Sequence, residues 1–272
     1  MDATKIRIGA VSYLNTKPLV WGLAARLPWA EVVFDLPSRL ADDLAAGKLD
    51  IALIPSVEYF QDASYSLVSD ACIACRGPVW SVKLFSRVPP EQIVTLALDE
   101  GSRTSAALVR VLLAEKYGVS PRTVRLPIAA EPTAIIADAV LLIGDRAIHE
   151  PPGDWACVWD LGDEWNRWTE LPFVFAMWTA RAGLDPSLLA EVDFALRQTR
   201  DAGLENLAEI AAQEAAQVKL TPADCLSYLR DNLYFYLGPR EQRGLQLFYR
   251  HVNELGLAPS GLRLPVVEST IS

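Results

Sequence analysis

Histidine and cysteine, the side chains that most often bind transition metals, are scarce in this sequence of 272 residues. The two histidines, His149 and His251, lie far apart and in no metal-binding or catalytic pattern. Of the four cysteines, Cys72 and Cys75 form a C-x-x-C pair, and no second pair accompanies it at the spacing of a zinc site. We therefore predict no metal site. We interpret the two thiols as buried and free, with a redox or metal role as the alternative.

Basic residues are also in the minority, because 25 lysines and arginines against 34 acidic residues give a formal net charge of −9. Nucleic-acid binding depends on clustered lysine and arginine side chains that contact phosphates, so we expect no nucleic-acid partner. A small anionic ligand remains compatible with this charge, because the N-terminus of a helix offers local positive potential even in an acidic protein.

Long apolar runs are missing too, since none approaches the roughly 18 residues of a membrane span. Residues 1–9 lack the basic start and apolar core of a secretion signal and lead directly into an expected strand. These features predict a cytoplasmic protein with no membrane partner. The sequence contains no Walker A, G-x-G-x-x-G, G-x-S-x-G or H-E-x-x-H pattern, so we predict no nucleotide, metal or other cofactor. It leaves the oligomeric state open.

Strand-like and helix-like segments alternate along much of the chain, which is typical of α/β proteins. Apolar, β-branched runs predict strands, and apolar residues at helical spacing predict helices. The expected strands cover residues 5–11, 32–36, 50–54, 94–98, 124–126 and 139–143. The expected helices cover residues 15–27, the stretch after Ser38, and residues 106–117, 188–205, 207–218 and 238–255.

A second unit, which begins near Pro89-Pro90, lies between two strand-like segments at residues 79–86 and 173–179. This arrangement indicates one lobe inserted into another through a two-strand hinge. We predict a two-lobed α/β fold of the periplasmic-binding-protein type, each lobe a mainly parallel sheet flanked by helices. The first lobe would comprise residues 1–86 and 176–272, the inserted second lobe residues 87–175, and the ligand cleft would lie between them.

Ligands of open parallel sheets bind at the carboxyl ends of the strands, where the following helices begin. The best candidate on physical grounds follows an expected strand at residues 101–105, because the free N–H groups and the dipole of the next helix favour a carboxylate. The alternative is that Ser102 or Thr104 simply caps the helix, and Ser56 has the same alternative role. The other polar strand ends are residues 12–18, 54–59 and 144–146, where Asp145 and Arg146 could instead form a surface ion pair.

Six segments carry a recognisable pattern: residues 8–19 (IGAVSYLNTKPL), 37–59, 69–86 (SDACIACRGPVWSVKLFS), 98–105, 141–147 (LLIGDRA) and 160–178. In this order they resemble the chorismate dehydratase family of the futalosine route to menaquinone. The likeness is close over residues 6–180 and loose over the helical remainder.

The resemblance implies a periplasmic-binding-protein type II fold that performs catalysis. It implies a hydro-lyase that converts chorismate to 3-[(1-carboxyvinyl)oxy]benzoate for menaquinone biosynthesis. Two positions are functionally important in this family, the asparagine of S-Y-L-N and the serine that follows P-V-W. They match Asn15 and Ser81, which we predict to be catalytic. The S-R-T-S stretch at residues 102–105 also matches and is a candidate carboxylate cradle.

Chorismate carries two carboxylates, so two anchoring points are expected. No strong general base stands among the matched residues, and we hypothesise that the side-chain carboxylate of the substrate accepts the ring proton. Asn15 would orient the leaving hydroxyl, and Ser81 would donate a hydrogen bond near the reacting carbons. The predicted substrate-binding residues are Thr16, Ser56, Ser102, Thr104 and Ser105.

Two other readings stay open at this point. One is the related pathway enzyme that forms 1,4-dihydroxy-6-naphthoate, and the other is a non-catalytic protein that binds a small anion. The S-Y-L-N and P-V-W-S stretches favour the dehydratase over the related enzyme. The expected lack of a secretion signal favours an enzyme over an exported receptor.

Overall fold

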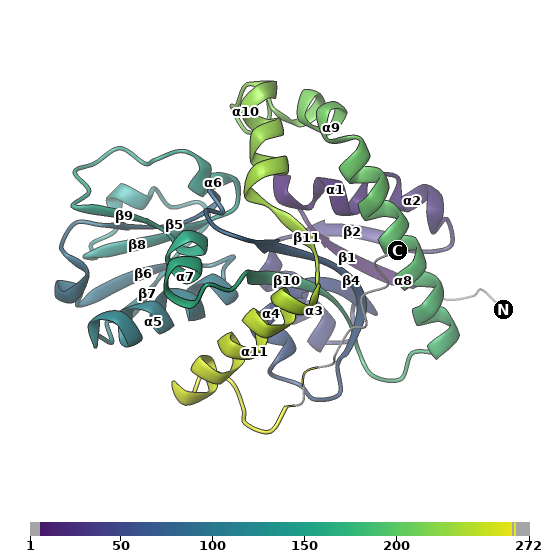
Figure 1. The fold of residues 1–272 in the computed structure, drawn as a ribbon, viewed down its shortest axis with the longest axis horizontal. Helices are drawn as coiled ribbons and strands as arrows, with labels where there is room; N and C mark the ends of the chain where they lie inside the picture. Colours follow the sequence, from purple (N-terminus) through teal and green to yellow (C-terminus); the bar gives the residue numbers. More distant parts are fainter. Residues whose placement is uncertain (1–5, 263, 265–272) are drawn as a thin grey trace.

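A computed structural model describes residues 6–262 and 264. It contains two β-sheets that lie side by side, each covered by helices (Figure 1). We call the part built on the six-stranded sheet the first lobe and the part built on the five-stranded sheet the second lobe. The two-lobed α/β architecture is therefore as predicted. No helix within the described residues is long and apolar enough to cross a membrane.

The sheet of the first lobe has the strand order β11-β4-β10-β3-β1-β2. Its N-terminal strands are parallel, as expected of β-α-β units, with β1 between β2 and β3. Its other pairs are antiparallel: β10, which follows the second lobe, pairs with β3 and β4, and β11, which follows C-terminal helices, pairs with β4. The sheet is consequently mixed rather than mainly parallel. Its strands are β1 (Arg7–Val11), β2 (Glu31–Asp35), β3 (Ile51–Pro55), β4 (Ser66–Cys75), β10 (Phe173–Ala180) and β11 (Tyr234–Tyr236).

The sheet of the second lobe has the order β7-β6-β8-β5-β9 and is also mixed. The strand β6 pairs in parallel with β7 and β8, whereas β5 pairs antiparallel with β8 and β9. The predicted strand at 139–143 is reproduced residue for residue by β8, which is buried throughout. The strands are β5 (Val82–Ser86), β6 (Thr95–Asp99), β7 (Arg122–Leu126), β8 (Ala139–Ile143) and β9 (Cys157–Asp160).

The chain crosses between the lobes at positions that differ from the predicted boundaries at residues 86 and 176. The strand β4 belongs to the first lobe and β5 to the second, so the first crossing occupies residues 76–81. The return crossing occupies residues 170–172, between a helix of the second lobe and β10. Residues 82–86 therefore pair in the second sheet and residues 173–175 in the first. The first crossing joins two strands that both contain apolar residues, so no change of pattern marks the change of sheet there.

The helices cover the faces of both sheets, as Figure 1 shows. The expected helix at 15–27 is divided, because Gly22 adopts the left-handed conformation (φ +75°) and separates two short helices. The first lobe carries α1 (Lys17–Val20), α2 (Leu23–Arg26), α3 (Pro37–Ala45), α4 (Ser56–Tyr59), α8 (Pro186–Glu205), α9 (Leu207–Glu214), α10 (Pro222–Ser227) and α11 (Pro239–Glu254). The second lobe carries α5 (Thr104–Tyr117), α6 (Asp145–Ile148) and α7 (Leu161–Thr169). Short 3-10 turns occupy Leu14–Thr16, Pro90–Gln92 and Pro132–Ala134, and a π turn occupies Tyr228–Asn232.

The hydrophobic core continues from one lobe into the other. Strand β3 is buried over its whole length, and β10 is buried on both faces, as their unbroken apolar sequences predict. All four cysteines are free thiols, and Cys72 and Cys75 are buried in β4. Burial raises the pKa of Cys75 to about 12, so this thiol stays protonated and weakly nucleophilic.

Candidate active site

A pocket opens where the strand ends of the two lobes face each other. Its walls are contributed by both sheets, including Val11, Ile73 and Phe175 of the first and Val82 and Ile143 of the second. The pocket is partly open to solvent, and the space between its walls, open mouth included, is about 510 Å³. Polar side chains interrupt the apolar walls at Tyr13, Asn15, Ser81, Ser102, Arg103, Thr104 and Ser105. The pocket lies between the lobes, and of the predicted site residues Asn15, Ser81, Ser102, Thr104 and Ser105 line it, whereas Thr16 and Ser56 do not.

Asn15 lies in the 3-10 turn that follows β1, so the carboxyl end of this strand positions it. The Thr16 hydroxyl donates a hydrogen bond to Oδ1 of Asn15 at 3.3 Å, and Asn15 lines the pocket. The turn is also tied to the second lobe, because the Leu14 N–H donates to the Asp145 carboxylate at 3.1 Å. Thr16 itself is fully buried and does not line the pocket.

Ser81 ends the first crossing between the lobes and is almost completely buried. Its backbone N–H donates to the Val79 carbonyl at 2.8 Å, and its hydroxyl lies 3.5 Å from the same oxygen. Burial raises the pKa of Tyr228 far above its usual range, and a hydrogen bond with the Ser81 side chain offsets part of this rise. The serine hydroxyl thus stands in a confined place at the edge of the pocket.

The carboxylate of Asp160 holds the crossing in place. It accepts hydrogen bonds from the N–H groups of Val79 at 2.9 Å and Trp80 at 2.6 Å. It also caps α7, because it accepts from Gly162 at 3.0 Å and from Asp163 at 3.1 Å. Trp80 has a left-handed backbone (φ +64°), which is unfavourable for a bulky residue and has to be held by its surroundings. Asp160 supplies that restraint next to Ser81.

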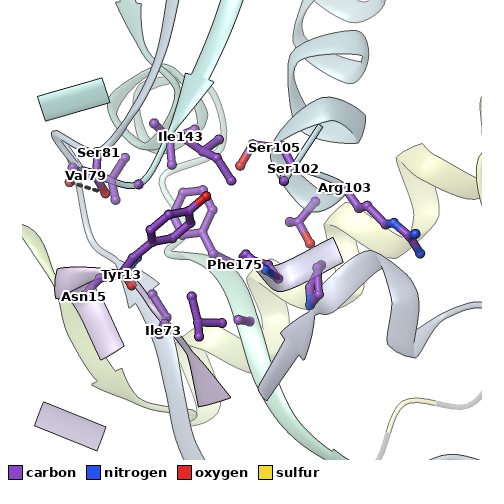
Figure 2. A pocket seen from close by; sticks show the side chains of 18 residues that line it. Tyr13, Asn15, Ile73, Val79, Ser81, Ser102, Arg103, Ser105, Ile143 and Phe175 are labelled. Atoms are coloured by element: carbon purple, nitrogen blue, oxygen red, sulfur yellow. Dashed lines mark hydrogen bonds between the residues drawn. The ribbon is translucent and has the colours of Figure 1, made fainter. Parts of the chain in front are cut away.

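The start of α5 forms the opposite side of the pocket from Asn15 and Ser81 in the view of Figure 2. The N-cap position is Arg103, and no side chain accepts a hydrogen bond there. The first N–H groups of a helix have no partner within the helix, so an uncapped start is free to bind an anion. The expected alternative, capping by Ser102 or Thr104, is not what the structure has. Ser105 lies in the first turn of the helix and lines the pocket.

Thr104 and Ser56 connect the two lobes. The Thr104 hydroxyl accepts a hydrogen bond from the Val57 N–H at 3.2 Å and lies 3.3 Å from the Ser56 hydroxyl. Ser56 in turn donates to the Val174 carbonyl at 2.8 Å and does not line the pocket. The hydroxyls of these two predicted binding residues therefore form hydrogen bonds within the protein. Only Thr104 of the two lines the pocket.

Charged groups surround this helix start. Arg103 pairs across the cleft with Asp42 at 2.7 Å and Glu58 at 2.9 Å, and among the described residues that line the pocket it alone is charged. Behind the pocket, Asp99 pairs with Arg146 at 3.1 Å, so Arg146 does not pair with its neighbour Asp145. Burial raises the pKa of Asp99 to about 6, and hydrogen bonding from Gly101 and the Arg146 charge limit the rise.

Three residues that shape the site were not among the predicted site residues. Tyr13 lies within the S-Y-L-N stretch, which marked its neighbour Asn15, and its ring stands in the middle of the pocket lining (Figure 2). Asp160 directly precedes a helix, a position that is typical of an N-cap. Phe175 gives no signal beyond belonging to an apolar strand.

Comparison with known proteins identifies the relationship of the chain. A family model described as "Menaquinone biosynthesis" matches residues 6–254. The chain belongs to this menaquinone-biosynthesis family. Members of similar sequence include a chorismate dehydratase of Thermus thermophilus, 34% identical over 89% of this chain and 93% of that protein. A chorismate dehydratase of Campylobacter jejuni is 26% identical over 90% of this chain and 93% of that protein. The resemblance inferred from the six sequence segments is confirmed.

Solved structures similar to this member of the menaquinone-biosynthesis family support the same architecture. A protein from Archaeoglobus fulgidus matches with a TM-score of 0.77 at 17% identity, over 94% of this chain and 100% of that chain. The alkanesulfonate-binding protein SsuA from Xanthomonas axonopodis pv. citri matches with a TM-score of 0.65 at 16% identity, over 96% of each chain. At these identities the likeness establishes the periplasmic-binding-protein fold alone.

Proposed function

We propose that the protein is a chorismate dehydratase, a hydro-lyase that removes water from chorismate to give 3-[(1-carboxyvinyl)oxy]benzoate for menaquinone biosynthesis. The observation that carries the proposal is the pocket between the lobes, where Asn15 and Ser81 face the uncapped start of α5. Family membership and the similarity to two curated chorismate dehydratases support the same reading. The proposal includes the cytoplasmic location expected for such an enzyme.

The pocket suits a dicarboxylate that carries a six-membered ring. One carboxylate would bind at the first turn of α5, where unpaired N–H groups and the helix dipole favour an anion. Ser102 and Ser105 add hydroxyl donors at the same place. The ring would lie against the apolar walls formed by residues such as Ile143 and Phe175. We propose supporting roles for Thr16 and Ser56, since the first orients Asn15 and the second bonds Thr104 across the cleft.

The reaction removes one ring proton and the adjacent hydroxyl, which leaves an aromatic ring. Among the described residues that line the pocket there is no carboxylate, imidazole or amine that would act as a general base. The enolpyruvyl carboxylate of the substrate would therefore take the proton and return it to the departing hydroxide, so that one water is released. Asn15 would hydrogen-bond the leaving hydroxyl, and Ser81 would hold the substrate near the reacting carbons. Aromatisation supplies the driving force, and the enzyme contributes orientation and polarisation.

This assignment is tested by substituting the two proposed catalytic residues. We expect Asn15→Ala and Ser81→Ala each to lower kcat by about 100-fold or more, the loss typical of a single group that stabilises a transition state. Ser64→Ala, in an exposed loop outside the pocket, is the matched control and should keep full activity. Turnover of chorismate would be followed by liquid chromatography and mass spectrometry. Full kcat in both pocket variants would contradict the assigned roles.

A further inference from the structure

The side chain of Tyr13 crosses from the first lobe into the second. The residue follows β1, and its ring passes beside Gly144, where a Cβ atom would lie only 2.7 Å from two ring carbons. Its hydroxyl lies beside Gly101, where a Cβ atom would lie 3.0 Å from the hydroxyl oxygen. Both glycines follow strands of the second sheet, β8 and β6. The absence of side chains at these two positions makes room for the tyrosine.

Two hydroxyl groups in this part of the pocket have no hydrogen-bond partner among the described residues. They belong to Tyr13 and Ser102, whose exposed fractions are 9% and 8%. Leaving a buried hydroxyl unpaired is unfavourable, so a pair of such groups beside one pocket calls for an explanation. The nearby carboxylate of Asp99 accepts from the Gly101 N–H at 3.0 Å and from Arg146 at 3.1 Å, and neither hydroxyl donates to it.

We propose that Tyr13 is a substrate-binding residue whose hydroxyl, together with that of Ser102, donates hydrogen bonds to one carboxylate of the substrate at the start of α5. The inference rests on the proposed function, since it names the groups that would hold the dicarboxylate in that pocket. Figure 2 shows the Tyr13 ring within the pocket lining, with Ser102 and Ser105 near the helix start. One donor comes from each lobe, so the anion would be held fully only when the lobes are closed.

The chemistry of the surroundings favours an anion over a neutral or cationic group. Burial raises the pKa of Tyr13 far above its usual range, and the charges of Asp99 and Asp145 add to the rise, so the hydroxyl remains a donor. The N-terminus of α5 adds positive potential, and its side-chain cap is missing. The Arg146 guanidinium lies against Asp99 and reduces the repulsion that this carboxylate would exert on a ligand.

The test separates binding from turnover by using the reaction product, 3-[(1-carboxyvinyl)oxy]benzoate, as the ligand. Its Kd would be measured by isothermal titration calorimetry on the full-length wild-type protein and on Tyr13→Phe, Ser102→Ala and the double variant. Each single substitution should weaken binding by roughly tenfold or more, as expected for loss of a hydrogen bond to a charged group. The double variant should lose less than the product of the two factors, because both groups bind the same carboxylate. In turnover of chorismate, Tyr13→Phe should raise KM more than it lowers kcat.

The matched control is Tyr117→Phe, at the far end of α5, where the ring stacks on Trp159 outside the pocket. It should bind the product as the wild type does, and circular dichroism should show all variants folded. If Tyr13→Phe and Ser102→Ala both bind within twofold of a wild-type protein that dehydrates chorismate, this proposal alone is wrong. If the wild-type protein neither dehydrates chorismate nor binds the product, the proposed function is wrong as well.

Discussion

Replacing Asp160 by alanine should disturb stability and activity together, because this carboxylate supports both α7 and the segment that carries Ser81. Four backbone N–H groups donate to it, two in the crossing at Val79 and Trp80 and two in the first turn of α7. No other side chain caps α7. The variant would therefore leave the crossing without its acceptor and the helix without its cap.

The magnitude follows from these two sets of bonds. Loss of an N-cap typically costs about 1 kcal/mol, and each partly buried N–H left without an acceptor costs about 1 kcal/mol or more. The free energy of unfolding should thus fall by about 3 kcal/mol, measured by urea denaturation with tryptophan fluorescence. Once released, Trp80 can leave its left-handed conformation, and Ser81 moves with it. We expect kcat for chorismate to fall by about tenfold or more, since small displacements of a catalytic group are costly.

Asp185→Ala is the matched control for this substitution. Asp185 caps α8 by accepting from the Ser187 N–H at 2.8 Å, and it is exposed and remote from the pocket. This control should lose about 1 kcal/mol and keep its kcat. Asp160→Asn, whose amide oxygen still accepts hydrogen bonds, should fall between the wild type and the alanine variant. Equal stability losses for the two alanine variants, with kcat unchanged in both, would refute the role given to Asp160.

Three further predictions concern the glycine, the ion pairs and the buried acid near the pocket. Gly144→Ala should strain a backbone at φ +60° and place a methyl group against the Tyr13 ring. We expect it to cost about 1–3 kcal/mol of unfolding free energy and to raise KM. Unchanged stability and kinetics would contradict the close packing. Arg103→Ala should remove two ion pairs across the cleft and make closure of the two lobes less favourable. We expect KM to rise several-fold with a smaller change in kcat. Steady-state kinetics would measure both, and an unchanged KM would contradict this role. Asp99 has its pKa raised to about 6, so between about pH 4 and 6 the folded protein holds a proton that the unfolded chain has lost. Stability should therefore fall as pH rises through that window, by up to about 3 kcal/mol. Urea denaturation at several pH values should show this fall weakened in Asp99→Asn, and identical pH profiles would refute the assignment.

The elements predicted best from the sequence are those whose pattern depends only on local residues. The strand at 139–143 and the helix at 106–117 were found because one is an unbroken apolar run and the other lies between clear boundaries, although α5 starts two residues earlier. The sheet to which a strand belongs was harder to predict. Both β4 and β5 have strand-like sequences on either side of Gly77 and Pro78, and nothing local shows that they belong to different sheets.

The residues of the candidate site, too, could be predicted only where the signal is local or comes from the family resemblance. The helix start at residues 101–105 could be predicted because its pattern is local, but hydroxyl residues in that place are equally typical of an N-cap, so the sequence left open whether the start is free. The positions of Asn15 and Ser81 were suggested by family resemblance, and the structure brings them to one pocket. The contact between Asp160 and Trp80 joins residues 80 positions apart, and the passage of Tyr13 beside Gly144 joins the two lobes. Such contacts follow from the tertiary arrangement and leave no periodic signal in the sequence.

We propose that this pocket dehydrates chorismate with its own side chains and the substrate's carboxylate. The most direct measurement is to dialyse the purified protein against a metal chelator, add chorismate without nucleotide, and analyse the mixture by liquid chromatography and mass spectrometry. We expect chorismate to disappear and 3-[(1-carboxyvinyl)oxy]benzoate, lighter by one water, to appear in equal amount. Chorismate that remains unchanged while it stabilises the protein against heat would contradict the claim and favour a binding protein of the same fold.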